Sequence, residues 1–126
     1  MVTTLIILSV VFSILSGLFK AICDLSEEEK IKGNPLFWHK NKSWQNKWKN
    51  GDKKQGEKFF GSSRWFVLFT DAWHLFGLLF RLSFIVTYTS MGMLANVSYS
   101  YLFGVLVAYV IFAISFHIFY TYKIIK

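Results

Sequence analysis

Apolar residues gather in three long runs along this chain, and a polar stretch separates the first run from the other two. The runs cover residues 1–23, 62–88 and 101–122. A helix needs about 20 mainly apolar residues to cross the hydrocarbon core of a bilayer. The pattern therefore predicts an all-α fold, namely a small multi-pass integral membrane protein with three transmembrane helices.

The polar stretch, residues 24–61, predicts two further helices. Ser26 and Glu29 have the spacing of a capping box, which favours a short helix beginning at Ser26. Residues 36–49 place aromatic side chains on one helical face with lysines beside it, as in an amphipathic helix lying among lipid headgroups. The residues that define this interfacial helix are Phe37, Lys40, Trp44, Lys47 and Trp48.

Two other interpretations of residues 36–49 stay open at this point. The aromatic face fits packing against the protein's own loop or a neighbouring subunit, and tryptophans between lysines fit single-stranded nucleic acid. Nucleic acid is the less favoured partner because no nucleic-acid motif accompanies the segment.

The second apolar run raises the question of whether residues 62–97 cross the membrane once or twice. Two crossings would need a turn near Arg81, where the sequence has no Gly, Pro or Asn. One helix from Ser63 to Tyr88 spans roughly 38 Å at 1.5 Å per residue, which suits a single tilted crossing. We therefore expect one crossing over residues 62–88, with Ser62 or Ser63 as the N-cap.

The charge distribution orients the predicted helices. The chain has 126 residues, of which 54% are hydrophobic, and a formal net charge of +7. Eleven of the fourteen basic residues lie between Lys20 and Arg64. Because cytoplasmic loops carry the excess of Lys and Arg, we expect residues 24–61 and the tail 123–126 in the cytoplasm. The N-terminus and a turn over residues 89–100 are then external.

Ionisable residues interrupt the second run at Asp71, His74 and Arg81. Such groups in a membrane segment are functional candidates because hydrocarbon tolerates them only where they face protein or water. At 100° per residue the three share one helical face, with Arg81 toward the outside. Asp71 and His117 of the last run lie at similar distances from their cytoplasmic ends, which predicts a contact between them.

A second polar stripe lies in the first run, where Ser9, Ser13 and Ser16 share one face. Their spacing is typical of small residues that bring membrane helices together. The hydroxyls either bond back to their own turn inside a helix contact or line a water-filled path in an oligomer.

Three chemistries fit the ionisable residues: a proton relay, a cation-selective ring, and a transition-metal site held by Asp71, His74 and His117. A structural role, with these groups bonded across the bundle or paired with Arg81, is the fourth interpretation. The sequence has no glycine-rich phosphate loop, nucleophile elbow or HExxH, so we expect neither an enzyme nor a cofactor.

The leading hypothesis is a homo-oligomeric protein of the bacterial inner membrane that forms a pore or controls permeability, opened as an effector by a cytoplasmic partner. Its path would be lined by Asp71, His74, Arg81, His117 and the three serines, with the interfacial helix on anionic headgroups. The first alternative is a non-enzymatic membrane subunit or anchor that docks a larger complex through residues 24–60. A metal- or haem-dependent membrane enzyme is the weaker alternative.

Overall fold

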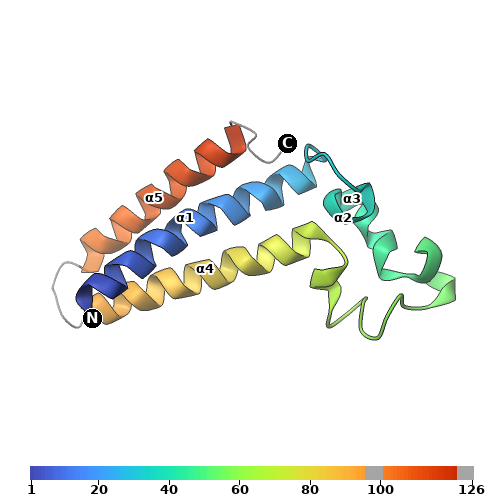
Figure 1. The fold of residues 1–126 in the computed structure, drawn as a ribbon, viewed down its shortest axis with the longest axis horizontal. Coiled ribbons are helices and arrows are strands. Elements are labelled where there is room, and N and C mark those ends of the chain that lie inside the picture. The colour runs from blue at the N-terminus through green and yellow to red at the C-terminus, as the bar shows by residue number, and fades with distance from the viewer. Residues whose placement is uncertain (96–100, 122–126) are drawn as a thin grey trace.

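The computed structural model describes residues 1–95 and 101–121, and it contains helices and no strand among those residues. Its three long helices are α1 (Val2–Glu27), α4 (Ala72–Ala95) and α5 (Tyr101–Thr121). α1 lies between the other two and packs against both, whereas α4 and α5 touch each other little (Figure 1). The polar segment extends from the end of the bundle where α1 ends and α4 begins.

Two of the long helices are apolar enough, and long enough, to cross a membrane: Val2–Glu27 and Ala72–Leu94. In α5, the apolar stretch among the residues whose side chains are described covers Gly104–Phe119. The predicted all-α class is therefore confirmed. Membrane insertion and the third crossing stay predictions.

Close packing between α1 and α5 depends on Gly17. A Cβ placed on this glycine would lie 1.9 Å from the Ser115 hydroxyl oxygen and 2.7 Å from the backbone nitrogen of Phe116. No side chain fits there without moving the α5 backbone. The small residues of α1 thus permit the central helix to approach its neighbour closely, as their spacing predicts.

α1 continues past the predicted boundary at residue 23, and the short helix predicted to begin at Ser26 is not formed. Ser26 lies in the last turn of α1 and donates a hydrogen bond of 2.5 Å to the carbonyl of Trp38. The helix continues because its apolar face does: Ile22 and Leu25 pack in one buried cluster with Ile31, which follows the helix.

The polar segment, residues 28–71, is called the head here, and it folds into short helices and turns. These are α2 (Pro35–Trp38), α3 (Lys40–Ser43) and the 3₁₀ helices η1 (Trp44–Lys47), η2 (Lys49–Gly51), η3 (Lys53–Gln55) and η4 (Val67–Phe69). The single amphipathic helix predicted over residues 36–49 is wrong. His39, with φ −102° and ψ 114°, and Trp48, with φ −116° and ψ 150°, interrupt it with extended backbone. Contacts between the head and the long helices outweigh the helical pattern of residues 36–49.

α4 begins at Ala72 instead of at the predicted Ser62, so that capping prediction is also wrong. Ser62 is buried, and its hydroxyl donates 2.7 Å to the carbonyl of Lys47. The side chain of Asn46 similarly donates 2.6 Å to the carbonyl of Thr70. These bonds to η1 hold the residues before α4 in a folded loop.

From Ala72, α4 runs without interruption through Arg81 to Ala95, as one helix rather than two joined by a turn. It therefore includes residues 89–95 of the predicted external turn. Residues 96–100 of that turn, and residues 122–126 at the predicted end of the last run and the tail, lie outside the described residues.

Candidate functional site

Asp71 directly precedes α4 and acts as its N-cap. Its Oδ1 accepts a hydrogen bond of 2.8 Å from the backbone N–H of His74, which has no partner within the helix. The Nδ1 atom of the His74 imidazole lies 2.7 Å from both carboxylate oxygens. The carboxylate is 1% exposed, and the positive end of the helix dipole favours its negative charge. Asp71 thus lies at the end of α4, one residue before the helix begins.

The predicted contact between Asp71 and His117 is wrong. Within the described residues, all side-chain hydrogen bonds of Asp71 run to His74. His117 is on α5 with an exposed side chain, and α5 packs mainly against α1 (Figure 1). The two residues lie apart because α4 begins so late that Asp71 comes before its first turn.

The metal alternative has no assembled ligand set in the structure. In the described parts of the chain, no three His, Cys, Asp or Glu residues are grouped so that they could hold a metal ion. Asp71 and His74 lie together, and His117 is on a different helix.

The serine stripe of α1 faces into the bundle. Ser9, Ser13 and Ser16 are each no more than 1% exposed. Their hydroxyls donate to carbonyls of their own helix: Ser9 to Ile6 at 2.8 Å, Ser13 to Ser9 at 2.6 Å and Ser16 to Ser13 at 2.8 Å. The polar atoms of this stripe are therefore paired within α1 and enclosed by protein.

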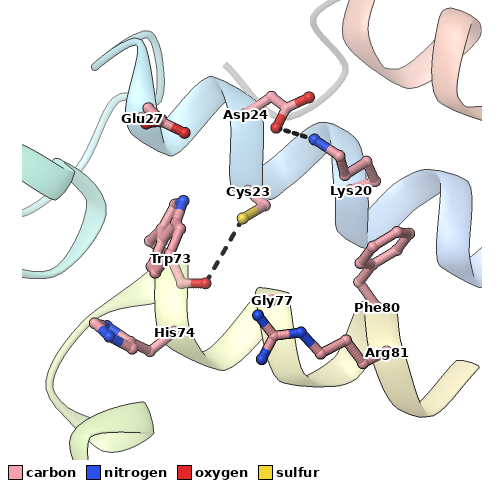
Figure 2. Close-up of a pocket in the computed structure, with 9 residues that line it drawn as sticks. All are labelled: Lys20, Cys23, Asp24, Glu27, Trp73, His74, Gly77, Phe80 and Arg81. Carbon is pink, nitrogen blue, oxygen red and sulfur yellow. Dashed lines mark hydrogen bonds and ion pairs between the residues drawn. The ribbon is translucent and has the colours of Figure 1, made fainter.

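A polar cleft of about 240 Å³ lies between the last turns of α1 and the first turns of α4 (Figure 2). α1 supplies one wall and α4 the other, and a Cβ added to Gly77 would lie 3.9 Å from the Cys23 Sγ of α1. The lining residues are Lys20, Cys23, Asp24, Glu27, Trp73, His74, Gly77, Phe80 and Arg81.

Lysines neutralise the two carboxylates of this cleft. Lys20 pairs with Asp24 one turn further along α1. Lys40 of the head reaches Glu27, with 2.5 Å between Nζ and Oε1, and lies 4.2 Å from the centroid of the Trp73 indole. The second pair, with its cation–π contact, ties the head to both walls of the cleft.

Arg81 lies in the same cleft as Lys20 and not toward the far end of the bundle, where the sequence placed it. Since α4 begins at Ala72, Arg81 is only in its third turn. Its side chain is exposed, and Figure 2 shows the guanidinium directed back along α4 toward Gly77.

The residues predicted to form an interfacial face are dispersed over the head. Trp44 is 48% exposed, whereas Phe37 packs edge-on against Trp38 with 5.2 Å between ring centroids. The other three are held by different contacts: Trp48 forms a β-bridge with Glu57, Lys47 accepts from Ser62, and Lys40 pairs with Glu27.

Sequence reasoning missed an exposed aromatic cluster just before α4. Its members are Phe59 at 41% exposure, Phe60 at 86%, Trp65 at 78%, Phe66 at 43% and Phe69 at 63%. The density of aromatic residues over 59–69 was a visible signal, but the helix predicted there assigned these side chains to a membrane span.

The loop beneath this cluster is organised by Glu57. Its carboxylate accepts from the Ser63 hydroxyl and from the backbone N–H groups of Gly61, at 2.9 Å, and Ser63, at 3.2 Å. The Ser63 and Gly61 hydrogen bonds lower the pKa of Glu57. Two glycines with positive φ, Gly56 and Gly61, flank this turn and were the sequence signal for it.

No family model, curated protein or solved structure matches this chain.

Proposed function

We propose that the protein is a non-enzymatic membrane anchor, in which α1, α4 and α5 cross the bilayer and hold the head at the cytoplasmic face. The observation that carries this proposal is that the polar side chains in and beside the long helices make hydrogen bonds that stabilise the helices themselves. The α1 serines are enclosed and paired within α1, and Asp71 caps α4. These polar groups therefore have a structural role.

The outer surface of the bundle supports insertion because large apolar side chains cover all three helices. Ile7 is 57% exposed on α1, Ile85 is 60% exposed on α4, and Leu106 is 58% exposed on α5. α5 has 21 residues, which corresponds to roughly 31 Å, about the thickness of the hydrocarbon core. A third crossing is therefore compatible with its length.

The orientation follows from the head. The basic residues between Lys20 and Arg64 lie at the end of the bundle where α1 ends and α4 begins. The positive-inside rule assigns this end to the cytoplasm, in a bacterial inner membrane. The aromatic cluster, residues 59–69, then seats the head in the headgroup region, where Trp and Phe side chains find both apolar and polar surroundings.

The same geometry favours an anchor over the homo-oligomeric pore of the sequence hypothesis. A water-filled axis needs polar side chains on an outward face of each subunit. The serines and Asp71 face inward, and the outward faces are mainly apolar. An anchor needs only an apolar bundle and a folded head, and both are present.

Reconstitution of the full chain into phosphatidylcholine vesicles loaded with a small fluorescent dye tests the proposal. We expect the protein to float with the vesicles, to resist alkaline extraction, and to release no more dye than empty vesicles do. Dye release that rises with protein concentration and falls in Asp71→Asn would contradict the anchor and support the pore.

Orientation is tested by labelling of engineered cysteines in a Cys23→Ala background. Asn50→Cys in the head should react with a membrane-impermeant maleimide only after the cytoplasmic side is opened. Thr3→Cys at the other end of α1 is the matched control and should react in intact spheroplasts. The reverse pattern would overturn the proposed orientation.

A further inference from the structure

Arg81 differs from the other charged groups of the cleft because its guanidinium has no hydrogen bond or ion pair within the described residues. The other charged groups around the cleft occur in bonded pairs: Lys20–Asp24, Lys40–Glu27 and Asp71–His74. The cleft therefore keeps one uncompensated positive charge, on Arg81.

Arg81 also lies where two recesses of different character meet. On one side is the polar cleft of about 240 Å³. On the other side is a shallow, open groove of about 360 Å³ along α4, whose lining is aromatic and aliphatic except for Arg81 itself. The residues that line this groove are Phe80, Arg81, Phe84, Ile85 and Tyr88.

We infer that Arg81 binds the phosphate of one anionic phospholipid, whose acyl chain lies in the groove along α4. This inference rests on the membrane insertion proposed above. An unpaired charge near hydrocarbon is costly, and a guanidinium matches a phosphate group with two parallel hydrogen bonds. The side chain points toward the polar end of the bundle, where lipid phosphates lie, as expected of an arginine that extends to the interface (Figure 2).

The apolar groove favours a phospholipid over a soluble phosphate as the ligand of this site. The polar cleft is smaller than the roughly 300–1,000 Å³ of typical ligand pockets, so it encloses little more than a headgroup. A phospholipid gains additional binding from its chain against Phe84 and Ile85, which a soluble anion cannot gain.

Native mass spectrometry of the full chain, released from nanodiscs that contain equal amounts of phosphatidylcholine and phosphatidylglycerol, tests the inference. We expect one phosphatidylglycerol retained per chain. Arg81→Gln should reduce this retention by about tenfold or more, since it removes a charge-assisted contact. Lys54→Gln is the control, because Lys54 is an exposed cation of the head that lines neither the cleft nor the groove and lies outside residues 59–69. It should retain the lipid as the native chain does.

A second variant separates lipid binding from loss of fold. Ile85→Asn places a polar group in the groove at a side chain that is 60% exposed, so the bundle should fold while lipid retention falls several-fold. Circular dichroism confirms the fold of each variant. Equal retention of the two lipids, or full retention by Arg81→Gln, overturns the inference.

Three outcomes are distinguishable in the same samples. If glycerol phosphate displaces phosphatidylglycerol at the concentrations where it binds by itself, the site is one for soluble anions and the lipid assignment is overturned. A chain that does not enter the nanodisc overturns the proposed anchor and this inference with it. A chain that enters but shows no lipid preference overturns only the inference.

Discussion

The carboxylate of Asp71 accepts a hydrogen bond of 2.8 Å from the backbone N–H of His74, and this bond fixes where α4 begins. The same carboxylate lies 2.7 Å from Nδ1 of the imidazole. In the sequence, an acidic residue and a histidine within an apolar run suggest a buried functional site. In the folded chain they form a helix cap and its first turn.

Removing this cap should destabilise the bundle more than removing its charge. Asp71→Ala loses the acceptor for the His74 N–H, and a lost cap costs roughly 0.5–2 kcal/mol of unfolding free energy. Asp71→Asn keeps an acceptor and should cost less than Asp71→Ala. Denaturant unfolding followed by circular dichroism measures both. Asp52→Ala in the head is the control, since Asp52 caps only the short η3, and it should leave the long helices unaffected.

Gly17→Ala should weaken the contact between α1 and α5. The new Cβ would lie 1.9 Å from the Ser115 hydroxyl and 2.7 Å from a backbone nitrogen, which requires movement of α5. Overpacking of this kind costs roughly 1–3 kcal/mol. Gly92→Ala on α4 is the matched control, because nothing lies within 4 Å of its added Cβ, and it should be neutral or slightly stabilising. Equal unfolding free energies for the two variants would contradict the packing described here.

The three apolar runs were predictable because hydropathy is a local property of the sequence, and helices form in all three. Their boundaries were not predictable. Whether residues before Ala72 join α4 depends on the hydrogen bond from Asn46 to the Thr70 carbonyl and on that from Ser62 to Lys47. These partners are distant in sequence, so no helical period or capping pattern reveals them.

Only part of the candidate site was predictable from the sequence, because some of its residues are close in the sequence and others come together only in the folded bundle. Asp71 and His74 are neighbours in any helical arrangement, so their proximity followed from the sequence. The position of Arg81 in the same cleft as Lys20 of α1 did not, because it depends on the start of α4 and on how two helices align.

The hydroxyl of Ser26 should be important for holding the head on the bundle. It donates 2.5 Å to the carbonyl of Trp38, and Ser26 is fully buried, so Ser26→Ala leaves that carbonyl without its partner at a cost of roughly 1–3 kcal/mol. Limited proteolysis should then cut the head sooner. Ser16→Ala is the control, since its equally buried hydroxyl bonds only within α1, and cleavage should match the native chain. Similar cleavage in the two variants would exclude this role for Ser26.

Acid should loosen the turn around Glu57. The Ser63 hydroxyl and the Gly61 N–H donate to the carboxylate and hold its folded-state pKa below the value in the unfolded chain, about 4.3. The stabilisation is therefore fully present above that value and is lost as the pH falls through the lower folded-state pKa. Hydrogen exchange at the Gly61 amide should accelerate at those pH values relative to an unstructured peptide.

Glu57→Gln is the control for this prediction, because it removes the ionisation. The exchange rate of its Gly61 amide, relative to an unstructured peptide, should not change with pH in this range. A matching acceleration in that variant would assign the acid sensitivity to another group.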